Sequence, residues 1–330
     1  MFTSGDLHVI VQAGEEDPKL FPLTSAVSGQ EVPKQLALIT GDGSLLQQTV
    51  ASYAALVPRE RITVVVSTKH EDLARAQLRQ WRGIGILTRP LDRGATVDLL
   101  FALARVVARA PEAAVIVAPA YHYVPGAGVL AGSLVAAGLA LATGPIIVAG
   151  AAMTGVAGGE RIVVPGPSLD GRVLSVCRLV ERASPAEARR LRASGALWDT
   201  SAFTARAVDL WKLAARKLPM RTAIVESLWA EKTPSPESVG AAFQRMPGTI
   251  QGGALWQGIK DVGVIPVHGS GWDAWSNPER VMNSLPDPLE LDRLFSRIYQ
   301  RQHGITRAQM RRRFREEARR REVPERVIHR

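Results

Sequence analysis

Hydrophobic segments of two kinds alternate along the first 120 residues. Short runs rich in Val and Ile predict buried strands, and longer stretches with apolar residues every three or four positions predict helices. The expected strands span 7–11, 62–66, 84–87 and 114–118, and the expected helices span 44–57, 71–81 and 96–110. A long polar loop is expected after the first strand. This alternation predicts a doubly wound, mostly parallel α/β sheet covered on both faces, with ligands at the carboxyl ends of the strands.

One uncharged stretch allows two interpretations. No Asp, Glu, Lys or Arg occurs from Ala113 to Gly159, and the part from Leu130 to Met153 is apolar enough to suggest a membrane span. Gly and Pro residues interrupt it, however, and divide it into a small-residue helix at about 127–142 and a strand at 145–149. Buried elements of α/β proteins have this composition, so we favour them over a membrane span.

The second half of the chain is less regular. Strands are expected at 161–164, 173–181 and 263–267, and helices at 185–194, 206–217 and 289–300, followed by a last basic helix. No internal repeat or low-complexity segment is found.

The positive charge is concentrated at the C-terminus. The chain carries a net charge of +10, of which residues 301–330, with 11 Arg and four Glu, supply +7. Glu316, Glu317 and Glu322 interleave with these Arg residues, which favours a solvated helix with i,i+4 ion pairs. An acidic partner, such as nucleic acid or an acidic membrane surface, is the alternative for this tail.

Cysteine usage and the N-terminus restrict the class of protein. Cys177 is the only cysteine, so the chain has neither an intrachain disulfide nor a thiolate zinc site. The N-terminus lacks a basic region followed by an apolar run, so a cytoplasmic location is expected. Whether the molecule is a homodimer is left open by the sequence.

Seven short motifs follow one another in a recognisable order. The first reads VQAGEEDPKLFPLT over residues 11–24 and is followed by VPKQL over 32–36. The others lie at 44–49, 89–95, 119–122, 181–183, 197–201 and 271–275. Together they resemble the motifs of the sugar-phosphate nucleotidyltransferases, most closely those of the mannose-1-phosphate guanylyltransferases, over roughly residues 7 to 285.

The resemblance implies a reaction and a set of site residues. The family joins a nucleoside triphosphate and a sugar 1-phosphate into a nucleotide sugar such as GDP-mannose, and releases pyrophosphate with the help of Mg²⁺. The matched positions imply phosphate contacts from Lys19 and Lys34, nucleotide contacts from Gly14, Arg89, Asp92 and Gly94, and sugar contacts from Glu181, Arg182, Trp198 and Asp199. The implied organisation is a nucleotidyltransferase-like domain over 1–285, with a nucleotide side to about 150 and a smaller sugar side from 151, and a helical basic tail over 286–330.

Several catalytic positions depart from the family pattern. Tyr121 and Ala274 stand where the family has metal-binding Asp residues, and neither a phenol nor a methyl group is a good magnesium ligand at neutral pH. Asp273 lies one residue early and could still reach a metal if the segment is a loop. In the phosphate loop, Glu15–Asp17 replace a Gly-rich run, Pro18 removes a backbone donor, and Lys19 replaces a bidentate Arg.

These departures leave two hypotheses. The favoured one is a catalytically silent member, a pseudoenzyme, that binds a nucleotide sugar or sugar phosphate as a sensor or scaffold. The alternative is an active nucleotidyltransferase whose metal ligands have moved, for example to the carboxylates of 15–17. The sequence does not identify the sugar or the base.

Overall fold

The computed structural model describes residues 7–40, 43–140, 146–154, 160–231, 233–248, 255, 262–285, 309, 312 and 316. They form two compact units. The sheet unit contains the described residues of 7–15, 49–120 and 124–272, and the small unit contains those of 16–48, 121–123 and 273 onward. The predicted boundary near residue 150 falls inside a strand, Ile146–Ala152.

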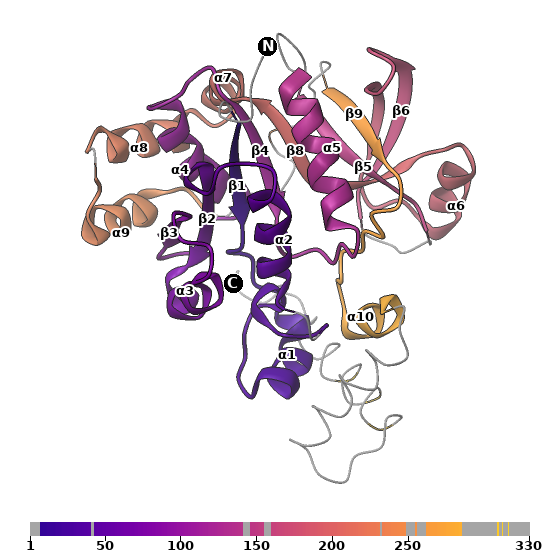
Figure 1. The fold of residues 1–330 in the computed structure, drawn as a ribbon, viewed down its shortest axis with the longest axis horizontal. Helices are drawn as coiled ribbons and strands as arrows, with labels where there is room; N and C mark the ends of the chain where they lie inside the picture. The colour runs from indigo at the N-terminus through magenta and orange to yellow at the C-terminus, as the bar shows by residue number, and fades with distance from the viewer. Residues whose placement is uncertain are drawn as a thin grey trace, which may run out of the picture. The chain divides into compact units, whose positions relative to one another are not determined.

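The sheet unit is built on nine strands in the order β3-β2-β1-β4-β8-β5-β9-β7-β6 (Figure 1). They are β1 (Leu7–Gln12), β2 (Ile62–Ser67), β3 (Gly85–Arg89), β4 (Ala114–Pro119), β5 (Ile146–Ala152), β6 (Ile162–Ser168), β7 (Leu174–Val180), β8 (Leu197–Arg206) and β9 (Val262–Val267). The strands β3, β2, β1 and β4 are all parallel, as the sequence predicted for the first 120 residues.

Beyond β4 the prediction of a mostly parallel sheet is wrong, because the sheet is mixed. Strand β8 runs antiparallel to both β4 and β5, and β7 runs antiparallel to β6 and β9. A further antiparallel pairing of β6 with β8 closes β8, β5, β9, β7 and β6 into a ring. Sequence periodicity did not reveal β8, because polar residues interrupt its apolar pattern. Buried Thr200 nevertheless fits the strand, since its hydroxyl donates to the carbonyl of Ala149 (2.8 Å).

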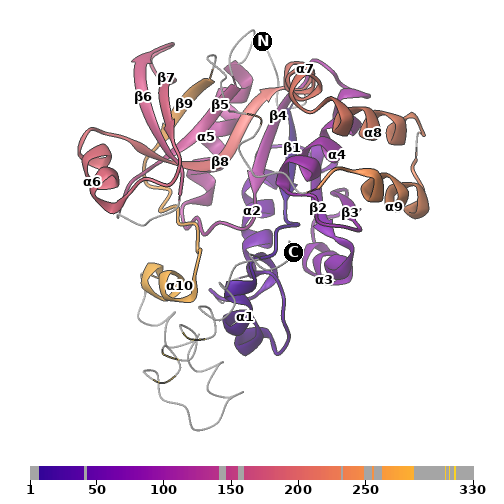
Figure 2. The same ribbon diagram turned by 180° about the vertical axis from the view of Figure 1, so that it is seen from behind.

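Helices cover both faces of the sheet unit. On one face, α4 (Ala95–Val107) packs with α7 (Ala207–Lys217) and α8 (Pro219–Ala230). On the other, α5 (Ala127–Ala140) packs across β1, β4, β5, β8 and β9, as the two opposite views show (Figures 1 and 2). The remaining helices are α2 (Leu45–Ala54), which begins in the small unit, α3 (Glu71–Leu78), α6 (Pro185–Ala193) and α9 (Pro236–Arg245).

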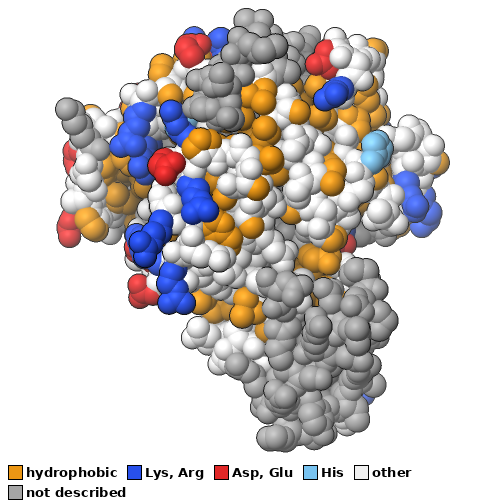
Figure 3. All heavy atoms as spheres, viewed as in Figure 1, with side chains coloured by type: hydrophobic (Ala, Val, Ile, Leu, Met, Phe, Trp, Pro, Cys, Tyr) orange, Lys and Arg blue, Asp and Glu red, His pale blue; other side chains and the backbone are white. Residues whose placement is uncertain are grey.

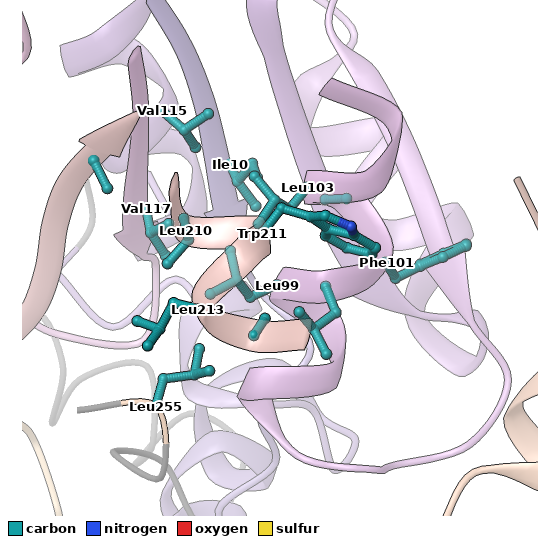
Figure 4. Packing of buried hydrophobic residues seen from close by; sticks show 14 of the residues in the cluster. Ile10, Leu99, Phe101, Leu103, Val115, Val117, Leu210, Trp211, Leu213 and Leu255 are labelled. Carbon is teal, nitrogen blue, oxygen red and sulfur yellow. The ribbon is translucent and has the colours of Figure 1, made fainter. Parts of the chain in front are cut away.

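The core between α4, α7 and the sheet is formed by aliphatic and aromatic side chains. Ile10, Val115 and Val117 of the sheet meet Leu99 and Leu103 of α4, with Leu210 and Trp211 of α7 beside them (Figure 4). Because residues of a strand alternate between its faces, Ile10 identifies the even-numbered positions of β1 as the α4 face.

The uncharged segment contains a helix and a strand, as favoured from its composition; the strand β5 is buried, whereas α5 is exposed along one side, where Val129 is 48% exposed. Helix α5 is 14 residues long, and no helix in the described part of the chain is long and apolar enough to span a membrane. The surface over α5 is largely uncharged, whereas Lys and Arg side chains gather on the side of α3 and α4 (Figure 3).

The small unit corrects the expectation of a long polar loop after β1. Helix α1 (Phe21–Ser28) forms there, with Pro22 in its first turn, and ends at Gly29, whose φ is 82°. Its buried residues include Leu23 and Val27, and this short apolar face carried too little periodicity to be recognised. The unit also contains α10 (Pro278–Ser284), which Asn277 caps by accepting from the amide of Arg280 (2.8 Å).

Most of the predicted basic tail, including the helix expected at 289–300, lies outside the described residues. The described residues 309, 312 and 316 are helical. Arg312 Nε lies 2.8 Å from Glu316 Oε1, which is an i,i+4 pair of the kind expected.

Candidate functional site

The predicted nucleotide-binding residues of the sheet unit lie together where β1 ends. Arg89, the last residue of β3, is buried, and its Nη2 donates to the carbonyl of Gly14. Its Nη1 is 3.4 Å from the carboxylate of exposed Asp92, which also accepts from the amide of Gly94 (2.9 Å) at the start of α4. The structure therefore brings Gly14, Arg89, Asp92 and Gly94 into one cluster.

Gly14 is required by the packing beneath it. A Cβ at this position would lie 2.5 Å from Arg89 Nε and 2.6 Å from Asp98 Oδ2. Any side chain would displace this buried Arg–Asp pair, so the glycine of the phosphate-loop motif is fixed by close approach.

Asp98 is a member of this cluster that the sequence did not single out. Its Oδ2 is 3.0 Å from Arg89 Nε, and both side chains are 3% exposed. Burial raises the pKa of Asp98 to about 7, the charge of Arg89 opposes this, and the charges of Asp92 and Glu15 reinforce it. The only acidic residue in the first turns of a mostly apolar helix was the available signal.

The sugar-side residues of the sheet unit form a second cluster, on β8. Asp199 is buried, and its two carboxylate oxygens accept from Arg161 Nη2 (2.8 Å) and from the amide of Ser201 (2.8 Å). Arg161 Nη2 is also 3.5 Å from Ser201 Oγ. Arg161 was not predicted as a site residue. It belongs to this cluster through its contact with Asp199, which lies far from it in the sequence.

The other predicted sugar-side residues differ in exposure. Trp198 is 2% exposed and lies in the wall of the strand ring, paired with Ala151 and Ile162. Glu181 and Arg182 follow β7 and are exposed. Solvent-accessible groups at this end are thus Glu181 and Arg182, whereas Trp198 and Asp199 support the site from within.

In the small unit, Lys34 is committed to backbone oxygens. Its buried Nζ donates to the carbonyls of Ala274 (2.7 Å) and Trp275 (3.1 Å). The predicted phosphate contact therefore holds in place the motif at 271–275, called the late motif below. Lys19 is half-buried, and its amide donates to Asp17, which begins a short 3₁₀ helix, Pro18–Leu20.

The late motif is also organised around Asp273. Its Oδ1 accepts from the amide of Trp275 (2.8 Å) and from Arg280 Nε (2.7 Å). Tyr123 pairs with Asp273 through the backbone and stacks on Trp275, with ring centroids 4.5 Å apart.

These side chains do not fit a magnesium site. Tyr121 and Ala274, at the two family positions, are both buried and offer a phenol and a methyl group. The neighbouring Asp273 already has the cation of Arg280 as its partner. Within the described ranges no group of three or more His, Cys, Asp or Glu residues is arranged to hold a metal.

Backbone strain coincides with the family-like motifs. Among the described residues, three that are not glycine have positive φ: Arg182 (52°), Ser201 (57°) and Trp275 (49°). Each lies in one of the three motifs that resemble the family's sugar-side and late elements. Ser201 stands where the family has Gly, so the left-handed conformation is kept although the residue suited to it is absent.

Comparison with known proteins gives a result for the fold alone. No protein-family model and no curated protein matches the chain. The solved structure of mannose-1-phosphate geranyltransferase from Thermus thermophilus superposes with a TM-score of 0.74 at 23% identity, covering 86% of this chain and 80% of that one. The chain has the fold of the sugar-phosphate nucleotidyltransferases.

Two other solved structures share this fold at lower similarity. Mannose-6-phosphate isomerase from Helicobacter pylori has a TM-score of 0.62 at 16% identity, covering 81% of this chain and 99% of that one. The inositol-1-phosphate CTP transferase from T. maritima has a TM-score of 0.52 at 14% identity, covering 93% and 100%.

Proposed function

We propose that the chain binds a nucleotide sugar or a sugar phosphate, such as GDP-mannose or mannose 1-phosphate, without transferring a nucleotide. The observation that carries this proposal is the left-handed backbone at Ser201. An L-residue pays roughly 1–2 kcal/mol for this conformation. Strain of this kind persists where surrounding contacts impose it, and it clusters at ligand sites.

The contacts that impose the strain belong to the sugar-side cluster. Asp199 holds the amide of Ser201 and the guanidinium of Arg161 together. Exposed Arg182, itself strained, follows β7, which pairs with β6, the strand that begins directly after Arg161. This is an ordered polar lining with one accessible positive charge, which suits a phosphorylated sugar.

Phosphoryl chemistry has weaker support than binding. Nucleotidyl transfer needs the charge of the leaving pyrophosphate to be neutralised. The exposed carboxylate of Glu15 follows Gly14 directly and repels a triphosphate, while Arg89 is turned inward to the carbonyl of Gly14. Tyr121 and Ala274 offer a phenol and a methyl group in place of carboxylates, so they do not hold a metal ion that could supply positive charge to the pyrophosphate.

Calorimetry with GDP-mannose and mannose 1-phosphate tests the binding, and a magnesium-dependent pyrophosphate-release assay across nucleotides and sugar phosphates tests the absence of transfer. We expect saturable heat with at least one ligand and no release of pyrophosphate. Absence of heat and of a thermal shift at millimolar ligand would contradict binding. Robust pyrophosphate release would instead establish an active enzyme, and its loss on replacing Glu16 or Asp17 would point to relocated metal ligands.

A matched pair of variants locates the binding. Asp199→Ala frees both Arg161 and the amide of Ser201, so ligand affinity should fall by about tenfold or more. Asp170→Ala is the control, because its exposed carboxylate also accepts from two backbone amides, those of Arg172 (3.1 Å) and Val173 (2.7 Å), on the hairpin between β6 and β7. Equal losses in both variants would argue against a site at the Asp199 cluster.

A further inference from the structure

A group of basic side chains lies at the opposite edge of the parallel strands, where β1, β2 and β3 begin. His8 is the second residue of β1, and Arg61 directly precedes β2. Arg105 lies in the last turn of α4, and Arg109 follows two residues after the helix ends. His8 shares the α4 face of β1 with Ile10. These four residues are called the basic cluster below.

One contact across the sheet joins two members of the basic cluster, and a third member lies against the start of β3. Arg61 Nη1 is 2.7 Å from His8 Nε2, because Ile62 pairs with Val9 and so places the two preceding residues side by side. Arg105 Nη1 lies 3.4 Å from the point where a Cβ on Gly85 would be, at the start of β3. The absence of a side chain at Gly85 leaves room for this guanidinium.

The positive charges of the basic cluster lower the pKa values of two of its own members, His8 and Arg105. Burial and then the charges of Arg61, Arg109 and Arg105 lower the pKa of His8 to about 4. His8 is therefore neutral at pH 7, and its Nε2 accepts a hydrogen bond from Arg61. The pKa of Arg105 is also lowered, first by burial and then by the charge of Arg109.

No carboxylate of the described chain neutralises this charge. Within the described ranges, no ion pair joins an Asp or Glu to Arg61, Arg105 or Arg109. Glu112 is paired with Arg206 (3.3 Å), and Glu60 is exposed and lies beside Gly83. The C-terminal end of α4 contributes only about half a negative charge, which does not offset three guanidinium groups.

We infer that the basic cluster binds a phosphate-class oxyanion at the amino-terminal edge of the sheet. Guanidinium groups bind such anions through paired N–H donors, and neutral His8 orients Arg61 without adding repulsion of its own. Strand β1, six residues and about 20 Å long, separates this position from Gly14. The site is thus distinct from the ligand position under the proposed function. A result that contradicts one of the two proposals leaves the other unchanged.

Calorimetry with inorganic phosphate at low ionic strength tests the inference. The wild-type protein should bind phosphate saturably at one site, and the double variant Arg105→Gln/Arg109→Gln should bind it about tenfold more weakly or worse. The matched control is Arg75→Gln/Arg79→Gln, which removes the same charge at the same spacing from α3 and its C-cap, where Arg75 already pairs with Glu71 (2.7 Å). Equal weakening in the two double variants would overturn the site.

Two further measurements keep the test decisive. If the double variant does not fold, as judged by circular dichroism, Arg61→Gln replaces it with the same expected loss. In the wild-type protein, phosphate should raise the pKa of His8, followed by NMR, because a bound anion offsets the neighbouring cations. No change at His8 on saturation, or binding of an oligonucleotide without binding of phosphate, would overturn the proposal.

Discussion

Two buried carboxylates of the sheet unit face arginine residues, and they are supported differently. Asp199 accepts from Arg161 and from the amide of Ser201, so both its oxygens are used. Asp98 has Arg89 beside Oδ2, but its Oδ1 is buried without a hydrogen-bond partner. Hydrogen bonds to both oxygens favour the charged form of a carboxylate, whereas burial without them favours the neutral form. A nearby cation alone therefore does not keep a buried carboxylate charged.

The largest test of this comparison removes the arginine from each pair at pH 8. Arg89→Met leaves Asp98 buried without its cation and leaves the carbonyl of Gly14 without its hydrogen-bond donor. We expect the free energy of unfolding to fall by about 3–5 kcal/mol. Arg161→Met should cost about 1–2 kcal/mol, because Asp199 keeps the amide of Ser201. Urea unfolding measures both losses, and equal losses would break the comparison.

The next largest effect is expected in the free energy of unfolding measured as a function of pH. The folded pKa of Asp98, about 7, lies above its ordinary value of 3.8, so between these values the folded state binds more protons than the unfolded state. The contribution of Asp98 to stability is therefore fully present below about pH 4 and is lost as the pH rises to about 7. Relative to Asp98→Asn, the wild-type protein should lose up to about 4 kcal/mol over this window, at about 1.4 kcal/mol for each pKa unit.

The control for the pH series is Asp199→Asn. This variant leaves Asp98 and Arg89 in place, so the stability loss that Asp98 causes between pH 4 and 7 should remain. If the loss disappears in Asp199→Asn and remains in Asp98→Asn, the roles of the two carboxylates are reversed.

The smallest effect concerns the backbone beside Asp199. Ser201→Gly relieves the left-handed strain and keeps the amide that Asp199 binds, so the free energy of unfolding should rise by up to about 1 kcal/mol. Thr200→Gly, next to it in the strand, should instead destabilise by about 1 kcal/mol or more, because it removes a buried hydrogen bond. Thermal melts of the two variants distinguish these signs.

The sequence predicted the elements that have a continuous pattern. The strands β1, β2 and β4 lie within about one residue of their predicted ends, because they are apolar on both faces. Strand β8 carries Asp199 and Ser201 in its middle, and their fit to a strand depends on partners elsewhere in the chain. Helices α1, α8 and α9 were missed for a related reason, since their short apolar faces are defined by packing.

The candidate site was predicted to a similar extent. Short motifs identified Gly14, Lys34 and Asp199 as positions of interest, and the structure gives each of them a specific set of contacts. Asp98 and Arg161 carry no motif. Their importance comes from contacts with Arg89 and Asp199, and such pairings do not follow from local pattern.

The closed ring of strands has a consequence for how copies of this chain meet. Strand β6 pairs with β7 and, through Ile162 and Val163, with β8, so β3 is the one strand of the described sheet that pairs with a single neighbour. Open edges offer backbone donors and acceptors to a strand from another molecule, and they are the usual starting points of strand-mediated aggregation. With only five residues, Gly85–Arg89, β3 is a short template, and the last of these is the buried Arg89. Of the strands in the described sheet, β3 is the one whose whole length is open on one side to such self-association.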